Sequence, residues 1–600
     1  MNCVTDNIST LKRETVNLSN LFEKRIQQLR NRPDLTATIK QLSDAKIPDI
    51  ESLLPSMRVA VGIDGSMDYD EVLEMLLFYV VSAGYECQFR ITEEGVPEFD
   101  LPDARRSPQL TMSAVVPLWR EDLLNVAEVM KPLETELDFR SNLERIPFAL
   151  MTMSELYLTY KIIREGKTGI IFLDRPFSGT YPSLYRDLSF MLMRKTPTLV
   201  GTPTSQGPVT KQDLRLASII GPGTFYIPQR YGFLHYLAVR ELLQGDLKRA
   251  ELATRLGVSE YEVQKALERL CRLEERYNFA LIETDDTGTI GIQPNARNFW
   301  ARTEEMTLQY AERIFNTSQD VQHPLMIRDN NWLSVIDLNA LNLFLLQMVM
   351  HEASKRRILI IGVAKDTTST DFTRSALPLE LKGKAKADLP GLKSDKALLT
   401  IISTVNADKI TTPWRTFSYD AAHTTMVLDD DELKAARGKI SRELFFVRQY
   451  FQLRTFTRDT EIRAPVFLFD RPYNSEYDGP YVESYHAKEQ HESTTLRLFM
   501  EPSSKRSLID DLCLLILSRS DNPEVLEAYG HNQLLYLADK FVKHEVQMTK
   551  GLLRGLVDLE LTPLARRQKV FSIARRFRDL RAESESARKS AVGTRQEITR

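Results

Sequence analysis

Cysteine is scarce in this 600-residue chain, and the few cysteines lie far apart. The four of them, Cys3, Cys87, Cys271 and Cys513, form no Cys-x-x-Cys pair. This spacing argues against a structural zinc site and against a disulfide framework. It is typical of a protein that works in the reducing cytoplasm, so we expect a cytoplasmic location.

Long apolar runs are also missing. The most apolar helical stretch, residues 338–350, is interrupted by Asn339, Asn342 and Gln347. It is too short and too polar to span a bilayer, so we expect a buried core helix and no membrane contact. The N-terminal stretch MNCVTDNISTLKRE has no apolar core behind its charges, and we therefore expect no signal peptide.

The chain lacks both a strong net charge and a nucleotide-binding loop. Its formal net charge is −3, so any contact with nucleic acid must come from local basic patches. No GxxxxGK[ST] segment occurs, and the stretch GPGTFYIPQRYG lacks the lysine and hydroxyl pair that holds phosphates. We therefore expect no ATP hydrolysis by a P-loop, and a partner would have to supply any unwinding.

The residues that are present describe an ordinary globular protein, 27% charged and 42% hydrophobic, which is long enough for several domains. Runs rich in Val, Ile, Tyr and Phe alternate with helical patterns. They predict a helix over residues 140–165 and strands over residues 58–66, 76–92, 168–174, 356–364 and 465–470. Strands interleaved with helices indicate an α/β fold with a mixed sheet.

The two ends of the chain carry patterns of different kinds. Near the N-terminus, apolar side chains recur at helical spacing and predict a one-faced helix over residues 10–30. Two interpretations of that face remain open: packing on its own domain, or an arm that joins two chains in a dimer. Residues 561–600 are rich in Arg and Lys, which suits either a solvated surface or contact with a phosphate backbone.

A different pattern interrupts the α/β alternation. Residues 246–270 read as two helices separated by Gly257, with Ser259 as the N-cap of the second helix. A hairpin around Asp286-Thr287-Gly288 follows, and together these elements predict a winged helix-turn-helix module. The second helix is only mildly basic, so contact with DNA and docking of a protein both remain open.

These patterns divide the chain into five predicted parts, with the α/β core split in two by the inserted module. The parts are an N-terminal helical arm (1–50), a first core segment (51–240), a winged-helix-like insert (241–300), a second core segment (301–560) and a basic C-terminal tail (561–600).

Three carboxylates stand out by their positions. We expect Asp64 to end the first strand, Glu155 to lie in the helix MTMSELYLTYKII, and Asp174 to end the strand TGIIFLD. If the two strands are neighbours and the helix packs over them, the three side chains can meet. Each acid by itself would serve equally well in a turn or on the surface, so the prediction depends on their convergence.

Carboxylates that meet repel one another unless a cation lies between them. Oxygen ligands suit the hard ions Mg²⁺ and Mn²⁺. Such ions hold water, lower its pKa and bind phosphate oxygens during in-line displacement, which is the chemistry of phosphodiester hydrolysis. The three acids therefore predict a metal-dependent nuclease centre.

The order of these acids resembles that of the ribonuclease-H-like nuclease fold. The strand VAVGIDGS, the spacing from Glu155 to Asp174 and the strand RRILIIGVAKD are similar to segments of the NurA nuclease family. Two later stretches, LRLFMEP at 496–502 and GHNQLLYLAD at 530–539, resemble that family's later segments. The resemblance covers most of residues 55–560, apart from the winged-helix-like insert.

The resemblance implies a manganese-dependent (or magnesium-dependent) deoxyribonuclease. Such enzymes cut single strands, degrade DNA from 5′ ends, form homodimers and process DNA ends with the hexameric HerA ATPase. Carried over by residue, the resemblance makes Asp64, Glu155 and Asp174 ligands of two metal ions, with Asp64 between them. Lys365 would lie near the scissile phosphate, Asp539 would complete the metal shell, and His531 would bind metal or touch phosphate.

Two departures from the family pattern keep a second function open. The family's Asp-Gly after the second strand is Asp174-Arg175 here, and its later Tyr-Pro pair is His531-Asn532. These changes are compatible with an active nuclease of altered specificity, and also with a catalytically inactive DNA-binding scaffold subunit. A transcription regulator is disfavoured, because the helix-turn-helix segment is a small part of the chain.

Overall fold

The fold is known from a computed structural model. The structure describes residues 2–30, 32–42, 47, 50–54, 56–72, 75–119, 122–123, 126, 136–222, 234–277, 280–316, 323–328, 331–381, 393–422, 426–429, 432–435, 446–457, 461–474, 478, 483–489, 492–502, 505–522 and 530–567. Within these residues, no helix combines the length and the apolar character that crossing a membrane requires.

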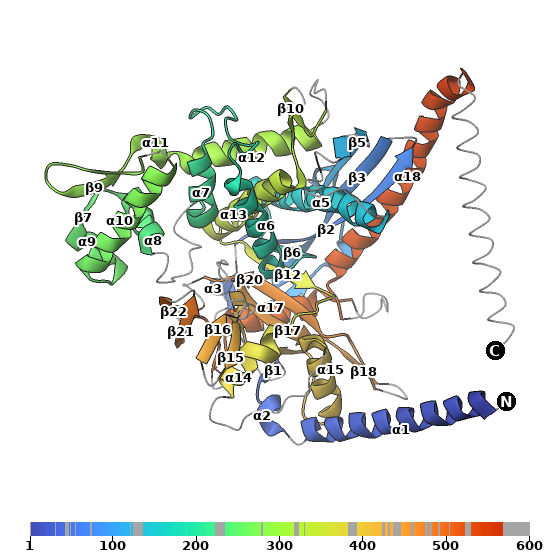
Figure 1. The fold of residues 1–600 in the computed structure, drawn as a ribbon. Helices are drawn as coiled ribbons and strands as arrows, with labels where there is room; N and C mark the ends of the chain where they lie inside the picture. The colour runs from blue at the N-terminus through green and yellow to red at the C-terminus, as the bar shows by residue number, and fades with distance from the viewer. Residues whose placement is uncertain are drawn as a thin grey trace.

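An eleven-stranded mixed sheet runs through the molecule (Figure 1). At its centre three parallel strands lie side by side, β2 (Val59–Val72), β6 (Ile170–Leu173) and β12 (Leu359–Ala364). On one side β3 (Met75–Ile91) pairs antiparallel with β2, and β5 (Thr111–Trp119) pairs antiparallel with β3. The spatial order in this half is therefore β5-β3-β2-β6-β12, and the predicted mixed α/β sheet is confirmed.

The other half of the sheet is antiparallel. Beyond β12 it continues in the order β20 (Phe467–Pro472), β17 (Phe446–Gln452), β13 (Trp414–Thr416) and β1 (Ile39–Gln41). The short strands β14 (Tyr419–Asp420) and β4 (Pro97–Phe99) pair with β17 and β3. The strand β1, from near the N-terminus, thus forms the edge of a half-sheet whose other strands come from the second half of the chain.

The strand that carries Asp64 is longer than the sequence pattern predicts. We expected it to end at Asp64, and this is wrong, because β2 continues to Val72 and pairs with β3 throughout. Along this extension, successive side chains alternate between the two faces of the sheet. Met67 and Tyr69 pack on one core, whereas Asp68 on the other face binds Lys550 Nζ at 2.6 Å.

Three long helices cover one face of the sheet, α5 (Glu136–Glu165), α6 (Phe177–Met193) and α13 (Val335–Lys355). Their apolar side chains form one core with Val61 and Ile63 of β2. Most side chains of α13 are buried, which confirms the expectation of a buried core helix over residues 338–350.

The opposite face is covered by α17 (Leu508–Arg519) and α18 (Gln533–Arg567). Leu534 and Leu535 of α18 pack in one core with Ala60 and Phe172 of the sheet. Asn532 caps this helix, since the backbone N–H of Leu535 donates to its side-chain oxygen at 3.0 Å. Asn532, one of the two residues that depart from the family pattern here, is therefore the N-cap of α18.

A separate group of elements lies at the periphery. It consists of α8 (Leu234–Gln244), α9 (Arg249–Leu256), α10 (Glu260–Tyr277) and a three-stranded sheet ordered β7 (Leu247–Lys248), β9 (Thr289–Ile292) and β8 (Ile282–Thr284). Gly257 ends α9 in the left-handed conformation, and Ser259 forms the predicted cap with Glu262. The two helices and the hairpin expected from the sequence are thus confirmed as elements.

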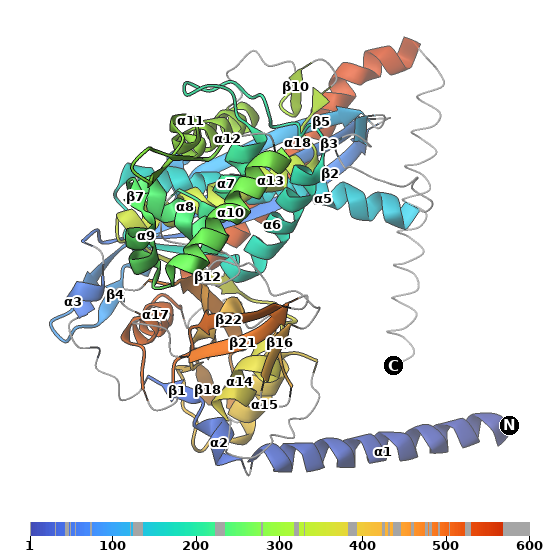
Figure 2. The same cartoon turned by 60° about the vertical axis from the view of Figure 1, so that its left-hand side comes forward.

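The N-terminal helix α1 (Asn2–Arg30) projects from the body of the molecule (Figures 1 and 2). Leu29 near its end is buried, whereas Leu18, Leu21 and Phe22 are 66%, 58% and 55% exposed. The predicted helix is confirmed, and the interpretation that its whole apolar face packs on its own domain is wrong. Of the predicted basic tail, only the backbone of residues 561–567 in α18 is described, and the rest lies outside the described residues.

Further helices, turns and strand pairs belong to the described part of the chain. They are α2 (Pro33–Thr36), α3 (Ile50–Leu53), α7 (Lys211–Ile220), α11 (Pro294–Arg297), α12 (Phe299–Phe315), α14 (Leu377–Glu380), α15 (Asp395–Val405), the 3₁₀ turns Leu101–Asp103 and Pro108–Leu110, the π-turn Phe372–Ala376, and the strand pairs β10 (Met326–Arg328) with β11 (Asn331–Trp332), β15 (Met426–Asp429) with β16 (Glu432–Ala435), β18 (Thr455–Thr457) with β19 (Glu461–Arg463), and β21 (Glu483–Glu489) with β22 (Glu492–Leu498).

Candidate metal centre

Strand register brings Asp64 and Asp174 side by side. In the parallel pairing of β2 with β6, Ile63 lies opposite Leu173, and the backbone N–H of Asp174 donates to the carbonyl of Ile63 at 3.2 Å. The next residue on each strand is therefore an aspartate on the same face of the sheet. Because β6 ends at Leu173 while β2 continues, Asp174 lies where the two strands part.

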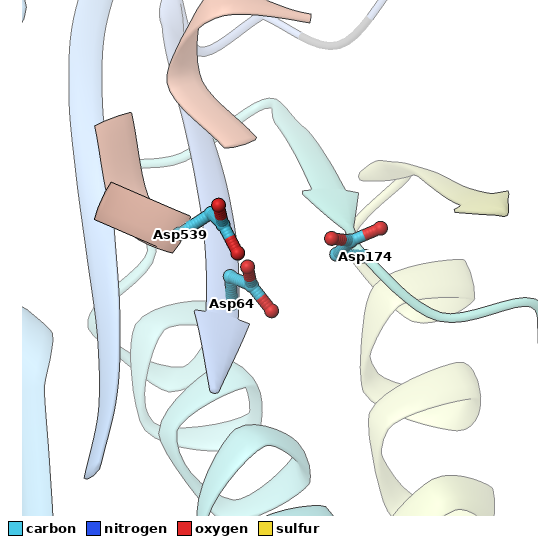
Figure 3. A group of neighbouring side chains, drawn as sticks. All are labelled: Asp64, Asp174 and Asp539. Carbon is cyan, nitrogen blue, oxygen red and sulfur yellow. The ribbon is translucent and has the colours of Figure 1, made fainter. Parts of the chain in front are cut away.

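A third aspartate arrives from the far end of the chain. Asp539 lies in the second turn of α18, which packs on the same face of β2 as Asp64. One carboxylate oxygen from each of Asp64, Asp174 and Asp539 lies within 4.8 Å of the others (Figure 3). Oxygens opposite each other around Mg²⁺ are separated by roughly 4 Å, so a small inward adjustment would suit a divalent ion.

Lys365 completes this face of the site. It follows β12, whose parallel register with β6 places it on the face that holds Asp174. Its Nζ lies 2.7 Å from Asp174 Oδ2, and the two side chains are 30% and 16% exposed. The structure thus brings together four of the predicted site residues, namely Asp64, Asp174, Asp539 and Lys365.

Burial and neighbouring negative charge perturb the proton affinity of Asp64. Burial, and then the charges of Asp174 and Glu155, raise the pKa of Asp64 to about 9. Asp64 is therefore protonated at neutral pH as long as no cation is bound. A divalent ion that bound here would displace this proton, because a carboxylate must be deprotonated to act as a ligand.

Lys365 and Asp539, which lie beside Asp64, are instead held in their charged forms. Burial lowers the pKa of Lys365, but the charge and hydrogen bond of Asp174 outweigh it, so the pKa of Lys365 is raised. Burial raises the pKa of Asp539, but the hydrogen bond from Lys543 and the charge of Lys365 outweigh it, so the pKa of Asp539 is lowered. Both groups stay charged at neutral pH.

Glu155 lies next to this group without belonging to it. Helix α5 is on the opposite face of the sheet, and the Glu155 carboxylate reaches β2 at Gly65, where a Cβ atom would lie 2.5 Å from Oε1. Its other oxygen accepts a hydrogen bond from Arg175 Nε at 2.7 Å. The three-aspartate group does not include Glu155, whose role as a metal ligand stays a prediction.

His531 lies at the start of α18 beside the same group. Both of its ring nitrogens are buried and have no hydrogen-bond partner among the described residues. Burial and the charge of Lys365 lower the pKa of His531 to about 3, so the ring is neutral and keeps a nitrogen lone pair. The three-aspartate group does not include this residue either, although a buried lone pair without a donor fits a nearby cation.

Sequence reasoning gave two residues too little weight. Arg175 was noted only as a departure from the family pattern, although an arginine directly after a predicted ligand was a visible signal. Lys543 was not singled out, yet its Nζ lies 2.7 Å from Asp539, one helical turn away. The donors present therefore fit a divalent cation, with three carboxylates at its core and two lysines at its edge.

Comparisons with known proteins give similarity at low identity. No protein-family model and no curated protein matches the sequence. The crystal structure of the NurA nuclease from Sulfolobus solfataricus is 10% identical, with 93% of this chain and 98% of that chain covered and a TM-score of 0.35. A structure of NurA with manganese is 11% identical, with coverage of 91% and 98% and a TM-score of 0.30. A structure of NurA bound to dAMP and manganese is 12% identical, with coverage of 78% and 87% and a TM-score of 0.28. TM-scores this low do not establish a common fold, so the function is argued from the site.

Proposed function

We propose that this chain is a divalent-metal-dependent DNA nuclease that hydrolyses phosphodiester bonds. The observation that carries the proposal is the convergence of Asp64, Asp174 and Asp539, with oxygens within 4.8 Å of one another. Three carboxylates gathered by two strands and a distant helix cost stability unless a cation joins them. The sequence motifs that resemble the NurA family support the same reading.

The strand order supports a ribonuclease-H-like core. Three antiparallel strands, β5, β3 and β2, are followed by the parallel strands β6 and β12, and α5 links β5 to β6 along the chain. A ribonuclease-H-like fold has this strand order. It carries one acid on its first strand, which here is Asp64 on β2, and one after its fourth strand, which here is Asp174 after β6. The group α8 to α10 with its small sheet supports a winged helix-turn-helix insert.

In this proposal Asp64, Asp174 and Asp539 hold Mn²⁺ or Mg²⁺, and the lone pair of His531 is available to the ion or to phosphate. A bound divalent ion would lower the pKa of a water ligand and stabilise charge on phosphate oxygens. Lys365 remains protonated and places a positive charge at Asp174, where it attracts the scissile phosphate. Asp64 and His531 are buried, which strengthens the electrostatic interactions of these two side chains.

The finer parts of the function are proposals as well. We infer single-strand cleavage and degradation from 5′ ends in DNA end processing, in the cytoplasm, with a HerA-type hexameric ATPase that supplies unwinding. The exposed apolar face of α1 at Leu18, Leu21 and Phe22 supports a homodimer, because such a face is otherwise left in water.

The rival function is a DNA-binding scaffold with an inactive core. One experiment separates the two: cleavage of single-stranded DNA, labelled at the 5′ or the 3′ end, with Mn²⁺, Mg²⁺ or chelator. Asp64→Asn should abolish cleavage and keep the fold, because Asp64 is already neutral without metal. Asp103→Asn, at an exposed position far from the three aspartates in the sequence, is the control and should cleave like the wild type. DNA binding without cleavage under every metal condition would favour the scaffold.

A further inference from the structure

A buried ion pair occupies the side of the site where Glu155 approaches Asp64. Arg175 Nε lies 2.7 Å from Glu155 Oε2, and the two side chains are only 10% and 5% exposed. A guanidinium stays charged at any pH that the protein meets. Glu155 therefore has a permanent positive partner before any metal ion binds.

Arg175 is fixed in this position by its surroundings. Its carbonyl oxygen lies directly over β12, where a Cβ atom on Gly362 would be only 2.5 Å away. The guanidinium carbon lies 5.5 Å from the ring centroid of Phe148, which adds a cation–π contact. Two residues further on, the backbone N–H of Phe177 donates to the buried Asp470 at 3.0 Å, so the following turn is anchored as well. The guanidinium is thus a built part of the site.

The position of Glu155 would otherwise suit a second cation. One of its oxygens lies against Gly65, the neighbour of Asp64. A carboxylate this close to a group of three aspartates adds to the local negative charge. The Arg175 guanidinium neutralises it in place of an ion.

The balance of charge favours a single divalent ion. Asp64, Asp174, Asp539 and Glu155 carry four negative charges when ionised, and Lys365, Lys543 and Arg175 carry three positive charges. One negative charge remains, so one divalent ion leaves one excess positive charge. Two divalent ions would leave three excess positive charges beside the buried Asp64 and Glu155, and uncompensated buried charge is costly.

We propose that the site binds one divalent ion, between Asp64, Asp174 and Asp539, and that the Arg175 guanidinium replaces a second ion beside Glu155. This inference rests on the proposed nuclease function, since it concerns the metal of that site. Arg175 then acts as a charge-balancing residue, and its effect is on how many ions bind. The sequence-based expectation of two ions would not hold for this chain.

The test is the number of Mn²⁺ ions bound per full-length chain, measured by equilibrium dialysis and by calorimetric titration. We expect one ion in the wild type and two in Arg175→Ala, because the freed Glu155 carboxylate becomes available. The double variant Arg175→Ala with Glu155→Gln should return to one. Arg186→Ala, at an exposed arginine on α6, is the matched control and should bind one.

Electron paramagnetic resonance gives an independent readout. Two Mn²⁺ ions about 4 Å apart are coupled, so their spectrum differs from that of isolated ions. The wild type should show the spectrum of an isolated ion, and Arg175→Ala should show coupling.

Each possible result supports or overturns either the one-ion inference or the nuclease proposal. Two ions in the wild type, or one ion in a folded Arg175→Ala chain, would overturn the inference and leave the nuclease proposal standing. No bound ion in the wild type would overturn the nuclease proposal itself. If Arg175→Ala fails to fold, the wild-type stoichiometry and spectrum alone still decide between one ion and two.

Discussion

Gly62 of β2 lies directly beneath Leu534 of α18, so close that a Cβ atom on Gly62 would be 2.6 Å from the Leu534 Cβ. It would also lie 2.7 Å from the Leu534 carbonyl carbon and 2.8 Å from the Leu535 nitrogen. Because two of these are backbone atoms, no side-chain rotation can relieve the contact. The glycine two residues before Asp64 therefore sets how closely α18, and with it Asp539, can approach the sheet.

The first prediction concerns this contact. Gly62→Ala should push α18 away from the sheet and lower the free energy of unfolding by about 2 kcal/mol, as overpacking does in a tight core. It should also weaken Mn²⁺ binding, because Asp539 moves with the helix. Urea denaturation and calorimetric titration measure the two effects. Gly245→Ala, whose Cβ atom would meet nothing within 4 Å, is the control, and an equal loss in both variants would contradict the argument.

A second prediction separates metal binding from catalysis at Lys365. Lys365→Ala removes a positive charge 2.7 Å from Asp174, so Mn²⁺ should bind about tenfold more tightly, or about 1.4 kcal/mol. Cleavage should nevertheless slow about 100-fold, because the phosphate loses its cation. Calorimetry and end-labelled cleavage assays give the two numbers. Lys543→Ala, which removes the more exposed partner of Asp539, should change cleavage little. Weaker metal binding in Lys365→Ala would refute this account.

A third prediction concerns a buried charge cluster away from the metal centre. Arg415 on β13 is fully buried, with Nη1 2.6 Å from Glu501 and Nε 2.8 Å from Asp511 of α17. Arg415→Ala removes the guanidinium from between two buried carboxylates, of which Asp511 keeps Arg506 Nε at 2.8 Å, and should lower the free energy of unfolding by about 3–5 kcal/mol. Arg90→Ala breaks the exposed pair with Glu98 and should cost less than about 0.5 kcal/mol. Urea unfolding measures the loss of stability in both variants. Similar losses in Arg415→Ala and Arg90→Ala would show that burial of the ion pair does not matter here.

The fourth prediction is a pH dependence of stability at His323. Its Nδ1 accepts a hydrogen bond from the Leu325 N–H at 3.1 Å, and its Nε2 contacts the Pro117 carbonyl. Burial lowers the pKa of His323 below the ordinary value of 6.5. The unfolded chain therefore takes up a proton first as the pH falls through about 6.5, and stability is lost in that direction.

The size of this effect is modest, because part of the ring stays exposed. We expect His323→Gln to reduce the loss of unfolding free energy between about pH 7.5 and pH 5.5 by about 0.5 kcal/mol relative to the wild type. Thermal or urea unfolding at several pH values measures it. An unchanged pH slope in the variant would show that His323 does not contribute.

Local patterns in the sequence were sufficient for most of the site's scaffold. The apolar runs that became β2, β3, β6, β12 and β20 were predicted, and so were α5 and the buried helix α13. Asp64 and Asp174 could be paired in advance because neighbouring parallel strands bring equivalent positions to one edge. Strands such as β1, β13 and β17 were missed, because they are short or fully buried and lack the alternation that marks a half-buried strand.

The sequence by itself determined the candidates for the site: two aspartates that follow apolar runs, a lysine after a third run, and Asp539 near the end of the chain. Only the tertiary structure decided that β2 runs past Asp64, that Asp539 joins the two strand aspartates, and that Glu155 pairs with Arg175 on the other side of the sheet. The physical reason is the distance along the chain between the residues that interact. A strand or a helix is favoured by neighbours a few residues away, whereas the distance between two carboxylates depends on how elements hundreds of residues apart pack against one another.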